Sequence, residues 1–166
     1  ILHSNGKIYG APHSANAWLE INPTNDTAQR IAIGIGSFNS SYVGNVSAGQ
    51  NWLGCVENPV DGTIHAIPFT SPYVLKFDPN SGISTNYGST GSGVNKWRGG
   101  VFFKGKIYCA ADQENYVLVL DPVGLTTAGI ATGFTKPGAF QGICAGPDGK
   151  LYMKPYISSK IVKTFL

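Results

Sequence analysis

Few side chains in this sequence could carry acid-base or metal chemistry. The chain has nine Asp and Glu residues and three histidines. Five carboxylates fall in predicted turns: Asp26, Asp61, Asp78, Asp121 and Asp148. Of the others, Asp112, Glu114 and Glu57, together with His13, are the candidates for a metal ligand or a general acid and base. They share no motif and no regular spacing, so the sequence predicts no catalytic residue, no metal site and no cofactor.

Other reactive groups show no functional pattern either. The three cysteines, Cys55, Cys109 and Cys144, have no CxxC spacing, which is evidence against a zinc site or a disulfide framework. Each stands where other parts of the chain carry a small or apolar residue, so buried free thiols are expected. The sequence contains no Walker motif, no Gly-x-Ser-x-Gly and no complete dinucleotide-binding fingerprint.

The chain repeats one short motif four times. The copies are Gly6-Lys7-Ile8-Tyr9, Gly62-Thr63-Ile64-His65, Gly105-Lys106-Ile107-Tyr108 and Gly149-Lys150-Leu151-Tyr152. Their central apolar residues are 56, 43 and 44 residues apart, and residues 37–51 account for the long first interval as a predicted insertion loop. A repeat of about 44 residues is typical of stacked supersecondary units such as propeller blades.

Further signals keep a fixed order around each copy. An aromatic-x-Gly element comes before it, as in Trp97-Arg98-Gly99, and an alternating strand that ends at a proline turn follows, as in Leu118 to Pro122. A fourth, weaker strand completes the unit. We therefore predict a single all-β domain over residues 1–166, a β-propeller of four-stranded antiparallel blades. The repeat units are 1–36, 52–88, 97–134 and 140–166.

The turn-and-strand pattern resembles the YVTN and NHL-like propeller repeats. The resemblance covers nearly the whole chain, although the aromatic-x-Gly opening departs from those repeats. It implies the propeller fold and a binding habit, because such repeats serve adhesion, surface-layer, scaffold and occasionally enzymatic roles. It does not select a reaction.

The strands add up to about three and a half blades. Only Ile1 to His3 remain of the innermost strand of the first unit, and the last unit ends after its third strand. A ring of four to eight blades does not close on this inventory. Three explanations stay open: a partial propeller cut from a longer polypeptide, two copies that pair into one ring, or a four-bladed ring that closes imperfectly.

Composition excludes some partners. Charged residues make up 13% of the chain and the net charge is +3. Lys7, Lys106 and Lys150 occupy the same repeat position, which predicts solvent-facing strand residues and no nucleic-acid stripe. No apolar run reaches the ~18 residues of a membrane span. We expect no nucleic acid and no membrane span, and we favour an extracellular or surface location.

Propeller geometry predicts where a ligand would bind. The loops between the second and third strands of each blade, and the segments that open each innermost strand, meet around the channel mouth. The predicted ligand-binding residues there are His13, Asn16, Trp52, Trp97, Arg98, Asp112, Gln113, Asn115, Phe140, Gln141 and Tyr156. For the aromatic residues that open the innermost strands, packing between blades is the favoured role and stacking on a sugar the alternative.

Two functions remain in view. The first is a non-catalytic binding or structural module that recognises a protein or glycan through loops at the channel mouth, in a surface, extracellular or virion appendage protein. The alternative is a propeller-fold hydrolase or lyase with an acidic or metal site at the same mouth. A second copy of the chain, or the remainder of a longer one, would complete the ring.

Overall fold

The computed structural model describes residues 1–33, 50–133, 140–157 and 162–164. Within these ranges the chain forms fourteen strands and no helix. The predicted insertion loop, residues 37–51, lies outside the described residues except for its last two positions.

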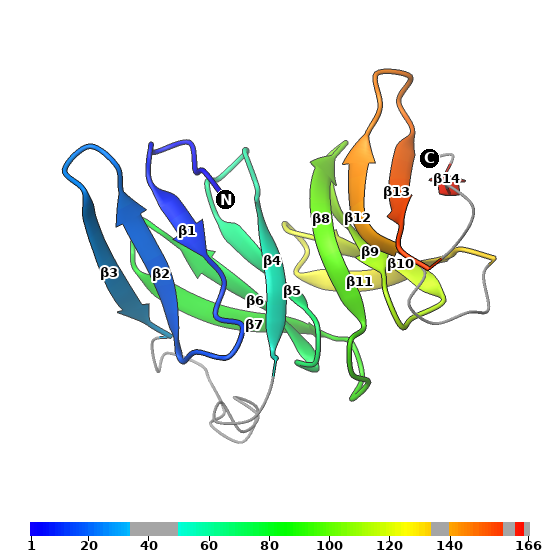
Figure 1. Cartoon of the computed structure of the whole chain (residues 1–166), viewed down its shortest axis with the longest axis horizontal. Helices are drawn as coiled ribbons and strands as arrows, with labels where there is room; N and C mark the ends of the chain where they lie inside the picture. Colours follow the sequence, from blue (N-terminus) through cyan, green and yellow to red (C-terminus); the bar gives the residue numbers. More distant parts are fainter. Residues whose placement is uncertain (34–49, 134–139, 158–161, 165–166) are drawn as a thin grey trace.

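The strands form four antiparallel sheets, which we call blades 1 to 4 (Figure 1). Blade 1 contains β1 (Ile8–Gly10), β2 (Ala17–Asn22) and β3 (Thr27–Ala32). Blade 2 contains β4 (Trp52–Glu57), β5 (Ile64–Pro68), β6 (Tyr73–Asp78) and β7 (Ile83–Ser89). Blade 3 contains β8 (Trp97–Phe103), β9 (Lys106–Ala111), β10 (Tyr116–Asp121) and β11 (Thr126–Ala131). Blade 4 contains β12 (Phe140–Ala145), β13 (Leu151–Pro155) and β14 (Val162–Thr164).

The strand register repeats from blade to blade. Ile8 pairs with Ile21, Ile64 with Phe77, and Ile107 with Leu120. In blade 1, Leu2 forms an isolated bridge with Ile8, so residues 1–3 stand where the innermost strand of the other blades runs. A constant register places equivalent side chains on equivalent faces, because successive residues of a strand point to opposite faces.

The turn chemistry of the hairpins follows the sequence. In the hairpin between β8 and β9, Lys104 and Gly105 have φ angles of 46° and 78°. Two successive positive φ angles define the type I′ turn, whose twist matches that of the flanking strands. Gly105 adopts this conformation without a steric penalty, whereas Lys104 adopts it at some cost.

The blades stand side by side as an open arc (Figure 1). Three clusters of buried apolar side chains lie between successive blades. Trp18 of blade 1 and Phe77 of blade 2, for example, stack with ring centroids 5.1 Å apart. The first and last sheets lie at opposite ends of the arc, so the described residues do not form a closed four-bladed ring.

The aromatic-x-Gly motif encodes a bulge in each innermost strand. The register shifts between Trp52 and Cys55 and between Arg98 and Gly100, and the same irregularity occurs in β12. Gly99 has a φ of +66°, and a Cβ there would lie 3.4 Å from the Cα of Gly142 in the next blade. The motif therefore allows neighbouring innermost strands to approach closely, because no side chain separates their backbones.

Candidate functional site

A relay of backbone hydrogen bonds links the loops at one edge of the arc, where β4 and β8 begin. The N–H of Asn51 donates to the carbonyl of His13 at 2.8 Å, and the carbonyl of Asn51 accepts from Phe69 at 2.9 Å. The same relation recurs one blade later, because Lys96 donates to the carbonyl of Phe69 at 2.8 Å and accepts from Asp112 at 2.9 Å. The residue before each innermost strand thus ties its own blade to the preceding one.

Four side chains gather on this framework, and we call them the mouth cluster: His13, Phe69, Arg98 and Asp112. The Arg98 guanidinium carbon lies 4.8 Å from the centroid of the Phe69 ring. The Nε of Arg98 donates a short hydrogen bond to the Asp112 carboxylate. The His13 ring lies on the same aromatic residue, with ring centroids 6.2 Å apart. The cluster joins three blades, since its members come from blades 1, 2 and 3.

Arg98 is fixed in position, and only part of its guanidinium group has a hydrogen-bond partner among the described residues. Its side chain is 32% exposed, whereas Asp112 is 2% exposed. Among the described residues, the two terminal guanidinium nitrogens of Arg98 have no hydrogen-bond partner. A guanidinium that is stacked on one face and fixed through Nε presents a preorganised pair of donors. Such a pair suits a carboxylate, a phosphate or two neighbouring hydroxyl oxygens.

The buried side chain of Lys96 holds the loop that carries Phe69. The Nζ of Lys96 donates to the carbonyls of Ser71 at 2.7 Å and Gly91 at 3.0 Å, with Thr70 at 3.4 Å. Its side chain is inaccessible to solvent, and this burial lowers the pKa of Lys96 to about 8. Because the carbonyls of Thr70 and Ser71 belong to the loop that begins at Phe69, Lys96 fixes the ring on which Arg98 stacks.

The three aromatic residues that open the innermost strands are placed differently from the rest of the predicted site. Trp52, Trp97 and Phe140 are fully buried, each in one of the clusters between blades. The indole N–H of Trp97 donates to the carbonyl of Tyr116 at 3.0 Å, and Trp52 makes the equivalent bond to Tyr73. Their rings pack between blades, the role that the sequence favours for them, and leave no face for a ligand.

The remaining predicted residues lie at the surface. Gln113 and Asn115 are exposed beside Asp112, and Gln141 is half-buried next to Gly142. Asn16 is exposed and accepts a hydrogen bond from Arg30 at 2.6 Å. Tyr156 is exposed in blade 4, at the end of the arc. The structure therefore brings His13, Arg98 and Asp112 together through Phe69, and Gln113 is the exposed residue that follows Asp112 in the chain.

Comparison with known proteins identifies the architecture. No protein-family model matches the chain, and no curated protein matches it in sequence. Virginiamycin B lyase from Staphylococcus aureus matches with a TM-score of 0.77 at 15% identity, over 98% of this chain and 50% of the lyase. The fold is that of a β-propeller.

Other propeller-type proteins match as well. The extracellular domain of a putative one-component system from Bacteroides thetaiotaomicron has a TM-score of 0.71 at 13% identity, over 99% of this chain and 20% of the other. An auxiliary nutrient-binding protein from Bacteroides ovatus has a TM-score of 0.68 at 13% identity, over 98% and 46%. The chain thus spans half or less of each of these proteins. The predicted resemblance to YVTN and NHL-like propellers agrees with these matches.

The candidates for acid-base chemistry are spread over the propeller arc. Glu57 lies 3.5 Å from the Nε2 of His3 and accepts from the backbone of Ser4 at 3.1 Å, away from the mouth cluster. Asp112 is committed to Arg98. Within residues 1–33, 50–133, 140–157 and 162–164, no three His, Cys, Asp or Glu side chains are grouped as a metal site. The same described residues contain no helix long and apolar enough to span a membrane.

Sequence reasoning missed two members of the site and misplaced one cysteine. Phe69 stands in a predicted loop, but its role depends on Arg98 of the next blade. Lys96 begins the Lys-Trp-x-Gly-Gly-Val element that opens the innermost strand, and that element does not indicate that the lysine is buried. The expectation that all three cysteines are buried is wrong for Cys144, which is exposed. Its face of blade 4 has no following blade against it among the described residues.

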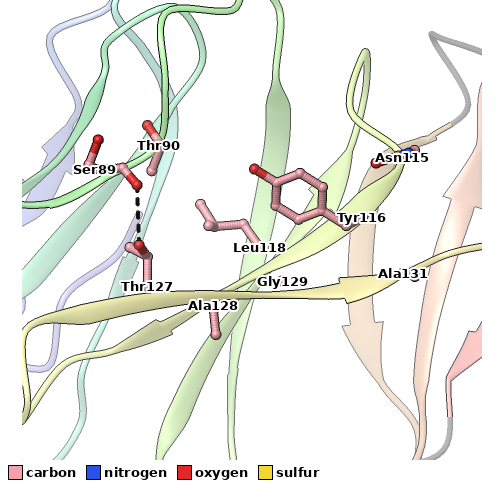
Figure 2. Close-up of a pocket in the computed structure, with 9 residues that line it drawn as sticks. All are labelled: Ser89, Thr90, Asn115, Tyr116, Leu118, Thr127, Ala128, Gly129 and Ala131. Atoms are coloured by element: carbon pink, nitrogen blue, oxygen red, sulfur yellow. Dashed lines mark hydrogen bonds between the residues drawn. The ribbon is translucent and has the colours of Figure 1, made fainter.

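A groove lies at the rim of the propeller, between β7 and the pair β10–β11 (Figure 2). Its volume is about 460 Å³, and no charged residue lines it. Thr127 donates to the carbonyl of Ser89 across the two blades at 3.4 Å, and Leu118 lies beside the Tyr116 ring. Of the predicted site residues only Asn115 reaches this groove, so it is separate from the mouth cluster.

Proposed function

We propose that this chain is a non-catalytic β-propeller binding module that recognises an extracellular ligand at the channel mouth. The observation that carries the proposal is the Arg98 guanidinium, stacked on Phe69 and fixed by Asp112, with its terminal nitrogens free among the described residues. A rigid donor pair loses little conformational entropy when it binds, which favours recognition of paired oxygen atoms.

The ligand class that fits best is a glycan that carries carboxylate groups. A sugar carboxylate offers the planar oxygen pair that a guanidinium binds through two parallel hydrogen bonds. Gln113, which follows Asp112 in the chain, has an exposed amide side chain that can bind hydroxyl groups. The match to an auxiliary nutrient-binding protein and to an extracellular domain supports a binding role and an extracellular location. A protein partner with an exposed carboxylate is the other class that this site would accept.

The test is a glycan array that carries uronic acid, sialic acid and neutral glycans, followed by calorimetry on the strongest hit. Arg98→Gln should weaken binding roughly 10- to 100-fold, the equivalent of one or two charge-assisted hydrogen bonds. Lys104→Gln removes an exposed cation from the hairpin at the other end of β8 and is the control, which should bind as the unaltered chain does. Equal affinity for Arg98→Gln would exclude the mouth cluster as the site, and an array without acidic hits would favour a protein partner.

A lyase is the second candidate, because two matching structures are lyases, namely virginiamycin B lyase and streptogramin B lyase. One further match is a catalytically inactive His-to-Ala variant of virginiamycin B lyase with quinupristin. In this chain His13 lies at the mouth and its Nδ1 is 3.0 Å from the Ser14 hydroxyl. Its nearest carboxylate in the cluster, Asp112, is paired with Arg98, which leaves no free partner for acid-base work there. Incubation with quinupristin should therefore leave the chromatographic retention and the ultraviolet spectrum of that compound unchanged, and a new product, of the same mass if a ring is opened by elimination, that disappears with His13→Ala would favour the lyase.

A further inference from the structure

The outward face of blade 1 carries a row of apolar side chains bordered by Arg30 of β3, and among the described residues no other sheet packs on it. Ile8 is 37% exposed and Leu19 is 43% exposed. They lie on the same side of the sheet, because Ile8 pairs with Ile21 and Gly10 pairs with Leu19. Leu2 extends the same row across its bridge to Ile8 and is 71% exposed. This face therefore presents adjacent aliphatic side chains to solvent, an arrangement that marks an interaction surface.

The same positions are buried in the other blades. The equivalents of Ile8 and Leu19 are Ile64 and Leu75 in blade 2 and Ile107 and Leu118 in blade 3, which are 0–2% exposed. In blade 2 these residues join the cluster shared with blade 1, and in blade 3 the cluster shared with blade 2. The residues that pack on the preceding blade are thus buried in blades 2 and 3, whereas their equivalents in blade 1 are exposed. The apolar row on blade 1 therefore has the register of a blade-to-blade junction.

The other end of the arc carries the complementary half. Tyr9 and Tyr108 occupy one repeat position, are buried, and point towards the following blade. In blade 4 this position is held by Tyr152, which is half-buried. Cys144 occupies the position of Val56, which is buried between blades 2 and 3, yet Cys144 is exposed. Blade 4 therefore presents a forward face in the same register, on which Lys154 is exposed where Ile67 of blade 2 and Ala110 of blade 3 are buried.

We propose that these two faces bind each other in a second copy of the chain. Blade 4 of one copy would pack on blade 1 of its partner, and blade 4 of the partner on blade 1 of the first, around a twofold axis along the channel. One chain carries both halves of the junction, so two copies leave neither half unpaired. The matched lyase chains are about twice as long as this one, since it spans 50% and 53% of them, so two copies supply as much chain as one lyase.

Such a ring would carry the mouth cluster twice, with both copies of Arg98 on the same face of one channel. The two junctions would be equivalent to the three that already exist within each chain. Both exposed faces would then be covered by a neighbouring blade, as the faces between successive blades of one chain are. This arrangement does not depend on which ligand the mouth binds.

The test is the native mass of the 166-residue chain at about 100 µM, where a dimer with a Kd near 1 µM would be nearly fully formed. We expect twice the chain mass of 17.6 kDa. Leu19→Lys should give a folded monomer, because it places a charge in the junction. Val60→Lys is the matched control, since Val60 is an exposed apolar residue in the β4–β5 hairpin, and it should stay dimeric.

Cys144 provides a second readout that reports on the face itself. Cys144 is exposed, whereas Cys55 and Cys109 are buried, so the rate at which a thiol reagent reacts shows whether the forward face of blade 4 is covered. Under the proposal the reagent reacts slowly with the unaltered dimer and quickly with Leu19→Lys. A monomer at this concentration would overturn the proposal, and so would a dimer in which Leu19→Lys leaves Cys144 reactivity unchanged. A natural polypeptide much heavier than 17.6 kDa that is monomeric would overturn the second copy as the occupant and assign both faces to further blades of the same chain.

Discussion

Replacement of His65 should change how the stability of the fold depends on pH. His65 is fully buried in β5, where its Nδ1 lies 2.8 Å from the Tyr87 hydroxyl and its Nε2 lies 3.0 Å from the hydroxyl of Thr63. Burial, with a smaller contribution from the positive charge of Lys76, lowers the pKa of His65 to about 4. The imidazole is therefore neutral in the folded protein at every pH above that value.

The size and sign of the effect follow from the two states of this histidine. In the unfolded chain a histidine titrates near 6.5, so between about pH 6.5 and pH 4 the unfolded state holds the proton and the folded state does not. The free energy of unfolding therefore falls as the pH is lowered through this window. One pKa unit is worth about 1.4 kcal/mol, which gives a loss of about 2 kcal/mol from pH 7 to pH 5.

The assay is urea unfolding at pH 7, 6 and 5, at one protein concentration, for the unaltered chain and for His65→Gln. Glutamine keeps an amide for Thr63 and Tyr87 and does not titrate, so its free energy of unfolding should lack the His65 contribution. Carboxylates with lowered pKa, such as Asp121 at about 2, lose their stabilising effect mainly below pH 5 and do so in both proteins. If both proteins lose the same free energy between pH 7 and pH 5, the argument that His65 is buried and neutral is wrong.

Two further substitutions test the packing that positions the site. Trp97→Ala should lower the free energy of unfolding by about 3–5 kcal/mol, because it empties a fully buried position between blades 2 and 3, and urea unfolding measures the loss. Gly99→Ala should lower it by about 1–2 kcal/mol, because its φ is +66° and L side chains disfavour this region. Gly6→Ala is a matched control for the second change, since its φ is +83° but a Cβ there meets nothing within 4 Å. A Cβ at Gly99 would lie at ordinary van der Waals distance from blade 4, so the two losses should be similar, and a Gly99→Ala protein as stable as the unaltered chain would contradict the argument from φ.

The repeat made most of the fold predictable. Each Gly-Lys-Ile-Tyr copy supplies a turn glycine and an alternating strand, and the same two signals lie at the same offsets in all four copies. Because the register within a blade is set by local hairpins, a local pattern is enough to predict it. The bulge at Gly99 was not predicted, although aromatic-x-Gly marks it. Its cause is the approach of the next innermost strand, which a single repeat does not contain.

The site was predictable only in part, for a related reason. His13, Arg98 and Asp112 were expected at the channel mouth because propeller topology brings their loops to one face. Phe69 was not singled out, since its contact with Arg98 crosses from one blade to the next. Trp97 and its equivalents are buried and do not belong to the site. They recur in every complete unit, as residues that pack between blades do. Residues that recur in every repeat unit thus predict the fold, whereas the members of the mouth cluster do not recur.

Several irregular positions converge on the junction between blades 2 and 3. His65 replaces a tyrosine of the repeat and pairs with Tyr87, which belongs to the cluster at this junction. Lys96 of blade 3 binds the carbonyls of the blade 2 loop that begins at Phe69. Arg98 of blade 3 then stacks on Phe69 of blade 2. The binding arginine thus depends on the relative position of two blades, so a change that loosens this junction should weaken ligand binding without touching the ligand.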